Sequence, residues 1–400
     1  MTPTAIRKRP RPAQRPAPRA PEPPRRSAAQ EAPDAPAADF SVFAGRLPTL
    51  QRALDLWPRL IEGPPLRLRS APVLMPFPQG MEAESAHAVR IAVVRHAPED
   101  AVELVRRVRA AMQRWDVTGV VFEPGYFFTP VSFDPPTAGR RAGGGQWTIQ
   151  WHRDHQADLF ARQPVVLPSA ALGARWVSGW NSTRRIALID TGDESADDQM
   201  AFQRNAFPGK EKPVDHNGHG TAMGSLIRAV APHVTLRSYR VFEPGTIRAE
   251  SVNALCALNV AVNSREVQVI CLPQRAEVSI DDMVVEGALR MVLHQHQEQG
   301  QYTPVVVCAA GNQAPDHLMS VPATLPGVVV CRGLDRQGLP APYNCLPPAE
   351  VQPHYLDALG GLQEDPLGTL CRSGHKAAAL YGSSCATAKI AATLAAGRGH

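Results

Sequence analysis

The chain has 400 residues, of which 44% are hydrophobic, so at least one domain is globular and two or three compact domains fit its length. The formal net charge at pH 7 is +5, but residues 1–26 alone carry eight Lys or Arg and one Glu, a net of +7. The rest of the chain is therefore close to neutral, which excludes a fold that steers nucleic acid by a global positive field.

Residues 1–39 are rich in Pro, Ala and Arg. They hold too few apolar side chains to offset the entropy of ordering, so we expect a disordered tail of polyproline character. A solvated tail is the simplest interpretation, and contact of this tail with nucleic acid or a membrane surface is the alternative. The chain shows no apolar run of signal-peptide length near its N-terminus and no stretch of 18 apolar residues. These features predict a cytoplasmic protein, with signal-independent export as the alternative.

Residues 40–134 have the pattern of a small α/β module. Alternating apolar and basic positions over 40–70 predict a short helix. After it, an amphipathic stretch that follows Pro98 predicts a longer helix, because proline suits the first helical turn. Three apolar runs predict strands, at Val89–Val94, Gly119–Glu123 and Phe127–Phe133. The glycine-rich start of residues 135–164, "PPTAGRRAGGGQ", predicts a flexible linker.

Residues 165–400 alternate between short apolar runs and helical patterns. The runs are "RRIALID", "VTLRSYRV", "VQVICL", "PVVVCAA" and "GVVVCRG". Continuous apolar strands that alternate with helices predict an α/β fold with a mostly parallel sheet, covered by helices on both faces. In such sheets, catalytic groups gather at the carboxyl ends of the strands.

Cysteine and acidic residues predict neither a metal site nor a cofactor. The seven cysteines, an odd number, fit buried free thiols better than a disulfide framework. No CxxC pair or His/Cys cluster indicates zinc. An acidic run lacks EF-hand spacing and is interpreted as a solvated loop; it comprises Asp193, Glu194, Asp197 and Asp198.

Four short segments place a reactive residue at a strand end or a helix start. Their residues are Asp190 in "IALIDTGD", His219 in "DHNGHGTAMGSLIRAVAP", Asn312 in "VVVCAAGNQ" and Ser384 in "YGSSCATAKIAA". Each segment alone has a purely structural interpretation, such as a tight turn, a glycine-rich helix cap or a serine N-cap on an alanine helix.

Two other hydrolase classes fit these segments poorly. "DTG" also marks aspartic proteases, but no second DTG or DSG occurs, and a symmetric dimer of that class does not match the α/β pattern. A nucleophile-elbow hydrolase needs its histidine after its serine, and only His400 follows Ser384.

Taken together and in this order, the four segments resemble the subtilisin-like serine protease family. The resemblance covers roughly residues 170–400. It implies that Ser384 is the nucleophile, His219 the general base and Asp190 the residue that orients the histidine. It also implies that Asn312 and the Ser384 backbone N–H stabilise the oxyanion, and that Ser383 fills the family's small hydroxyl position. The expected activity is a serine endopeptidase that acts on protein or peptide substrates.

Two features depart from the family pattern. Leu272-Pro273-Gln274 replaces the usual Ser-Leu-Gly at the edge that pairs with extended substrate, where a proline can remove a backbone donor. The given chain also stops sixteen residues after Ser384, so we expect a less buttressed nucleophile helix. These departures leave open a catalytically weak or inactive subtilisin-like fold that is used for protein binding or regulation.

The resemblance also suggests a role for residues 40–134. Family members commonly carry an N-terminal β-α-β propeptide that assists folding and inhibits the site. The module pattern is compatible with such intramolecular inhibition, and Arg140-Arg141 would then be an accessible cleavage point. A recognition or structural domain is the alternative.

Overall fold

The computed structural model of the protein describes residues 38–76, 88–130, 146–161, 185–202, 214–244, 246–264, 266–277, 286–295, 303–314, 317–373 and 377–397. The expected tail, apart from its last two residues, lies outside these residues. So do both ends of the expected linker, including Arg140 and Arg141.

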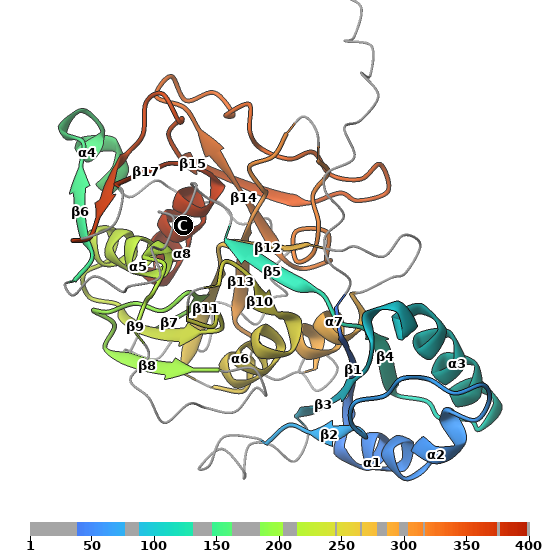
Figure 1. Ribbon diagram of the computed structural model, residues 1–400. Coiled ribbons are helices and arrows are strands. Elements are labelled where there is room, and N and C mark those ends of the chain that lie inside the picture. Colours follow the sequence, from blue (N-terminus) through green and yellow to red (C-terminus); the bar gives the residue numbers. More distant parts are fainter. Residues whose placement is uncertain are drawn as a thin grey trace, which may run out of the picture. The chain divides into compact units, whose positions relative to one another are not determined.

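A seven-stranded sheet forms the centre of residues 185–397 (Figure 1). Its order is β15-β14-β13-β11-β7-β9-β8, and every neighbouring pair is parallel. The strands are β7 (Arg185–Asp190), β8 (Asp198–Ala201), β9 (Thr235–Arg240), β11 (Val267–Leu272), β13 (Val305–Ala309), β14 (Val329–Leu334) and β15 (His354–Leu359). The prediction of an α/β fold built on a parallel sheet is confirmed.

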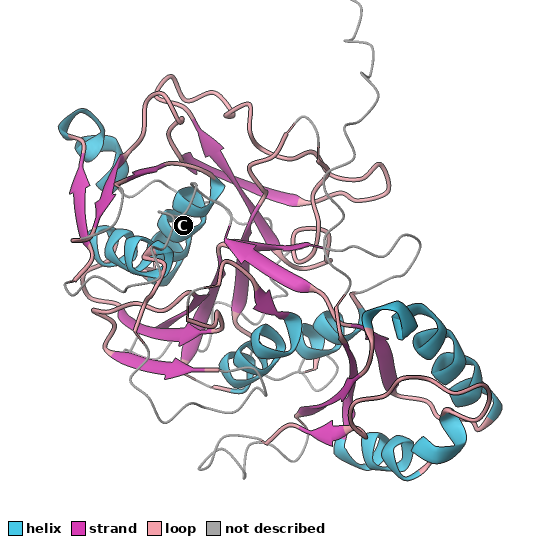
Figure 2. Cartoon of the chain, viewed as in Figure 1, coloured by secondary structure: helices cyan, strands magenta, loops and turns pink. Residues whose placement is uncertain are grey.

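Helices cover both faces of this sheet (Figure 2). Along β7, Ile186 and Leu188 pack in one core with α5 (His219–Val230) and α8 (Ser383–Ala395). The alternate residues Ala187 and Ile189 pack in a second core with α6 (Ser251–Asn263) and α7 (Gly287–His294). This two-sided burial explains why the strands read as continuous apolar runs.

The helix α8 is buried along its whole length. Its many alanines and small polar residues let it pack closely against the sheet and α5. The weak buttressing that we expected for this helix is therefore not seen.

The N-terminal module is an antiparallel sheet with helices on one face. Its strand order is β2-β3-β1-β4, formed by β1 (Phe40–Arg46), β2 (Val73–Leu74), β3 (Val89–Arg95) and β4 (Val120–Pro124). The helices are α1 (Leu47–Asp55), α2 (Trp57–Leu60), the 3-10 turn η2 (Pro98–Asp100) and α3 (Ala101–Arg114). The helix expected over 40–70 is wrong at its start, because "FSVFAGR" alternates between two buried faces and forms the central strand β1.

The second face of the module sheet packs on α6 and α7. Val42, Ile91 and Val93 share one core with residues of these helices. Two polar contacts fix the arrangement: Glu123 Oε2 accepts hydrogen bonds from the first backbone N–H groups of α7, at 2.9 and 3.2 Å, and Gln295 Oε1 accepts one from Val89 N at 2.8 Å. Burial raises the pKa of Glu123 to about 7.

A small sheet connects the module to the part of the chain built on the seven-stranded sheet, residues 185–397. Its middle strand is β5 (Phe127–Pro130), with β10 (Ala249–Glu250) on one side and β12 (Gln274–Glu277) on the other, both antiparallel (Figure 1). The strand predicted at 127–133 is thus present over its first four residues, and the remaining three lie outside the described residues.

Part of the expected linker is ordered structure. Residues 146–161 contain β6 (Thr148–Trp151) and α4 (Arg153–Phe160). The strand β6 pairs with β16 (Gly368–Cys371), which also pairs with β17 (Ala378–Leu380). Trp147 and Leu159 enter the core around α5 and α8, so residues 146–161 pack with the part of the chain built on the seven-stranded sheet.

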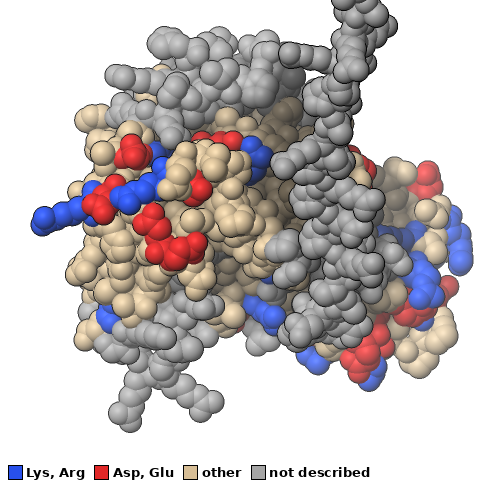
Figure 3. All heavy atoms as spheres, turned by 90° about the horizontal axis from the view of Figure 1, so that it is seen from above, with Lys and Arg blue, Asp and Glu red and all other residues tan. Residues whose placement is uncertain are grey.

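Charges on the surface are mixed in sign. On the face shown in Figure 3, Lys and Arg side chains lie among Asp and Glu side chains, as the near-neutral composition outside the tail predicts. Among the helices of the described residues, none is both long enough and apolar enough to cross a membrane.

Candidate active site

Asp190 and His219 form a buried pair at the carboxyl edge of the sheet. Asp190 is the last residue of β7 and His219 is the first residue of α5. Both carboxylate oxygens lie 2.8 Å from His219 Nδ1, and both side chains are almost fully buried. The backbone N–H of Thr191 also donates to Asp190 Oδ1 at 2.6 Å. This geometry can hold one ring nitrogen of the imidazole protonated, leaving the other as a base.

Asp215 positions the loop before His219 through four hydrogen bonds to its carboxylate. One carboxylate oxygen accepts the N–H groups of Asn217 and Gly218, at 3.0 and 2.7 Å. The other accepts the N–H and the hydroxyl of Thr221, at 2.9 and 2.7 Å. Asp215 is fully buried, and this burial raises the pKa of its carboxyl group. The carboxylate therefore caps the N-terminus of α5 and fixes the first helical residue.

A close backbone approach explains the glycine after His219. A Cβ atom at Gly220 would lie 1.9 Å from the carbonyl oxygen of Gly192, which follows Asp190 in the chain. The Gly220 N–H donates to the Thr191 hydroxyl at 2.8 Å. The two loops that carry Asp190 and His219 are thereby locked together.

Ser384 and Asn312 come together at the start of α8. The Asn312 side-chain oxygen accepts hydrogen bonds from the N–H and the hydroxyl of Ser383, at 3.0 and 2.9 Å. Asn312 Nδ2 lies next to Gly382. Only glycine fits at this position, because a Cβ atom would lie 2.2 Å from Asn312 Nδ2 and because the backbone φ is +118°. Ser383 thus orients the asparagine amide beside the residue that follows it, Ser384.

The Ser384 hydroxyl donates to the backbone carbonyl of Pro273, at 3.0 Å. Pro273 directly follows β11, the neighbour of β7 in the sheet. Ser384 therefore lies at the same sheet edge as Asp190, and its side chain is oriented by the edge segment that departs from the family pattern.

The acidic run after Asp190 makes structural ion pairs. Asp193 is buried and pairs with Arg228 at 2.8 Å, and Asp198 pairs with Arg237 at 2.7 Å. Within the part of the chain that the structure describes, no group of three or more His, Cys, Asp and Glu side chains could hold a metal ion. The seven cysteines are free, and six of them are buried.

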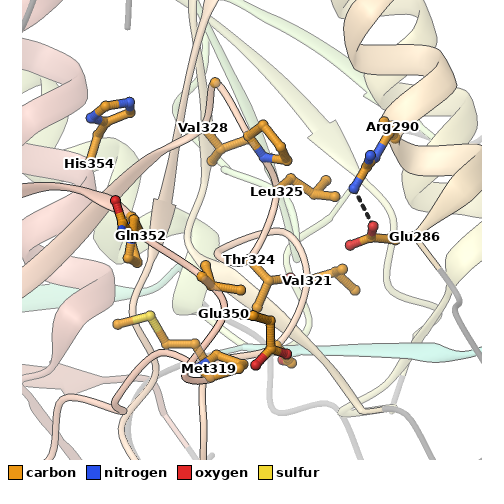
Figure 4. A pocket seen from close by; sticks show the side chains of 16 residues that line it. Glu286, Arg290, Met319, Val321, Thr324, Leu325, Val328, Glu350, Gln352 and His354 are labelled. Carbon is orange, nitrogen blue, oxygen red and sulfur yellow. Dashed lines mark hydrogen bonds and ion pairs between the residues drawn. The ribbon is translucent and has the colours of Figure 1, made fainter. Parts of the chain in front are cut away.

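A cavity of about 650 Å³ is a second feature of this part of the chain, and Figure 4 shows the side chains that line it. Its lining comes from residues 319–328 and 348–354 and from the Glu286–Arg290 pair. None of the four predicted site residues lines it. Its wall does support the site, because the Ser320 hydroxyl donates to the Ala276 carbonyl and Ala276 N donates to the Val321 carbonyl, both at 2.9 Å.

Comparison with known families agrees with this geometry. Residues 152–397, more than half of the chain, match the Subtilase family. The chain belongs to the subtilase family. A search of curated proteins found no match to the sequence. The matched region of this subtilase begins within the segment that we had expected to be a linker, in agreement with the packing of β6 and α4.

Two residues of this subtilase site were not singled out from the sequence. Asp215 stands three positions before Gly218 and six before Thr221, a capping pattern that could have been recognised in "DHNGHGT". Trp147 donates from its indole nitrogen to the Asp215 carbonyl at 2.8 Å, across a long stretch of chain. No local signal indicates this second contact.

The helix that carries Ser384 also contains a buried lysine. Lys389 is fully buried, and its ammonium group donates to the Asp158 carbonyl of α4. Burial lowers the pKa of Lys389 from its ordinary 10.5 to about 8. The lysine thus ties α4, in the segment expected as a linker, to α8.

This buried lysine makes the stability of this subtilase depend on pH. Between about pH 8 and 10.5 the unfolded chain binds more protons at this site than the folded chain, so the contribution of Lys389 to the free energy of unfolding is expected to rise with pH. Denaturant unfolding of a Ser384→Ala chain at several pH values, with and without Lys389→Met, measures this slope. The free energy of unfolding of the chain with Lys389, minus that of the Lys389→Met chain, should increase with pH across that window, and parallel curves would contradict the prediction.

Proposed function

We propose that the protein is a serine endopeptidase with Ser384 as its nucleophile. The observation that supports this most directly is the buried hydrogen bond between Asp190 and His219, at the same sheet edge as Ser384. A buried histidine oriented by a carboxylate, at the same sheet edge as a serine near a helix N-terminus, suits acyl transfer.

In the proposed reaction the Ser384 hydroxyl turns from the Pro273 carbonyl to the imidazole. His219 Nε2 takes its proton while Oγ forms a bond to the carbonyl carbon of the substrate peptide. Asp190 holds the Nδ1 proton and stabilises the imidazolium that forms. When the C–N bond breaks, His219 returns the proton to the leaving amine, and water then hydrolyses the acyl-enzyme by the same steps.

The tetrahedral intermediate requires donors for its oxyanion. Asn312 Nδ2 and the Ser384 backbone N–H are the proposed donors, because Ser383 orients the first and the α8 N-terminus presents the second. The positive end of the helix dipole adds to both.

Hydrolysis of a peptide that is blocked at both termini tests the proposal. We expect cleavage at an internal bond, and we expect a fluorophosphonate probe to label Ser384, as located by mass spectrometry. If neither occurs in the native chain nor in the Phe128→Ala chain described below, the fold is a binding or regulatory version of the subtilase architecture.

We further propose that the N-terminal module inhibits the site through β5. This strand lies between β10 and β12, with Pro130 opposite Gln274. Gln274 is adjacent in sequence to Pro273, whose carbonyl contacts the Ser384 hydroxyl. The strand therefore lies where an extended substrate would pair with the sheet edge.

Phe128→Ala is expected to release this inhibition. Phe128 is buried and lies opposite Ala249 and Ala276 on the two flanking strands, so its loss removes a buried apolar side chain from β5. Truncating a buried Phe costs about 3–5 kcal/mol, so the rate of peptide hydrolysis by the full chain should rise at least about ten-fold.

The rate is compared per active site, titrated with the fluorophosphonate probe. Phe127→Ala is the matched control, because Phe127 points to the opposite face of the same strand and is only half-buried. Equal rates for Phe128→Ala and the native chain would remove β5 as the inhibitory element.

A further inference from the structure

Gln274, the first residue of β12, has a buried side chain whose amide is not paired within the described part of the chain. Its side chain is 1% exposed, and neither Nε2 nor Oε1 has a hydrogen-bond partner among the described residues. A buried amide without partners is costly, and most buried polar groups in proteins are paired. A Met or Leu side chain would fill a similar volume without this cost.

The register of the small sheet shows what faces this amide. Gln274 lies directly opposite Pro130 of β5, and two residues on, Ala276 lies opposite Phe128. Residues directly opposite each other in an antiparallel pair share a face and lie in contact range. The amide is therefore next to Pro130, whose side chain is apolar and whose backbone has no N–H to donate.

The same register indicates which residue of a bound substrate peptide, counted from the cleaved bond, would lie opposite Gln274. The observed pairs end at Gln274 opposite Pro130. Extending this register by one residue would place the next residue of a bound substrate opposite Pro273, whose carbonyl contacts the Ser384 hydroxyl. A substrate carbonyl attacked by Ser384 thus belongs to the residue facing Pro273. The residue facing Gln274 is then the second one before the cleaved bond.

We propose that Gln274 is a specificity-determining residue that selects substrates with an amide side chain, Asn or Gln, at the second position before the cleaved bond. This inference rests on the proposed peptidase function. An amide side chain can both donate to Oε1 and accept from Nε2, which satisfies both orphaned atoms in one contact. The chain's own β5 has Pro130 opposite Gln274, and proline cannot pair with Gln274 Nε2 and Oε1. A substrate strand with an amide side chain at this position is therefore expected to bind there more tightly than β5 does.

The first test requires no catalysis and uses the full chain with Ser384→Ala. Pro130→Asn is compared with Pro130→Leu, a side chain of similar size, and each is combined with Gln274→Met. The readout is the rate at which added thermolysin cuts the chain next to β5. We expect Pro130→Asn to slow cutting at least about 5-fold relative to Pro130→Leu, and the difference to disappear with Gln274→Met. If the ratio of the cutting rates of Pro130→Leu and Pro130→Asn is the same with and without Gln274→Met, the proposal is overturned.

The second test measures kcat/KM for doubly blocked peptides that differ only at the second position before the cleaved bond. The native chain should prefer Asn over Leu at least about 5-fold, and Gln274→Met should remove or reverse the preference. Cleavage with a ratio that is insensitive to Gln274→Met would refute the specificity role and leave the peptidase function standing. If neither the native chain nor the Phe128→Ala chain cleaves any peptide while the thermolysin result holds, the peptidase function fails and Gln274 remains a residue that recognises the bound strand.

Discussion

Ser384→Ala is expected to lower kcat/KM for peptide hydrolysis about 10⁴- to 10⁶-fold. Without the hydroxyl there is no acyl-enzyme, and only the oxyanion donors and substrate binding remain to accelerate attack by water. The measurement is the initial rate with a fluorogenic peptide, beside fluorophosphonate labelling of the same samples. Circular dichroism and the unfolding midpoint report whether the variant stays folded.

Ser383→Ala is the matched control for that variant. Ser383 is also buried at the start of α8, but its hydroxyl is bonded to Asn312 and to the backbone of Gly311. Its loss should loosen the oxyanion asparagine and lower kcat about ten-fold, with labelling of Ser384 retained. Equal losses for the two serines would contradict the assignment of the nucleophile.

Asp190→Asn is expected to lower kcat about 10⁴-fold with the fold intact. Asparagine has nearly the same shape, but its amide can donate to His219 Nδ1 and favour the wrong imidazole tautomer. The imidazolium that forms during attack also loses its neighbouring negative charge. Both effects remove the general base without removing Ser384.

The measurement compares kcat and KM for Asp190→Asn and the native chain over a range of pH. A nearly unchanged KM with a much lower kcat is expected, because Asp190 is buried and its carboxylate contacts His219. A large rise in KM at constant kcat would show instead that the substitution disturbs the substrate cleft.

Much of the parallel sheet could be predicted from the sequence, because strands buried on both faces read as continuous apolar runs. The runs around Ile186–Ile189, Val267–Leu272 and Val305–Ala309 are each central strands of the sheet. The four motif segments likewise fall at strand ends and helix starts, where short local patterns with glycine and small residues define the turns.

The elements that were missed depend on contacts between distant parts of the chain. In β1, "FSVFAGR" is rich in strand-forming residues, but it is directly followed by the residues of α1, and its pairing with β3 and β4 fixes where the strand ends. The strand β6 pairs with β16, more than two hundred residues later in the chain. Two further contacts also join distant segments: the hydrogen bond from Ser384 to Pro273 and the pairing of β5 with β12. No local sequence pattern indicates either contact.

The position of β5 in the chain has a consequence for synthesis. A ribosome makes the module and β5 before it makes Asp190, His219 and, much later, Ser384, and domains fold as units while they emerge. The strand that lies in the proposed cleft therefore exists before the nucleophile does. At every stage of synthesis, β5 is therefore already present when the site that Ser384 completes can first assemble.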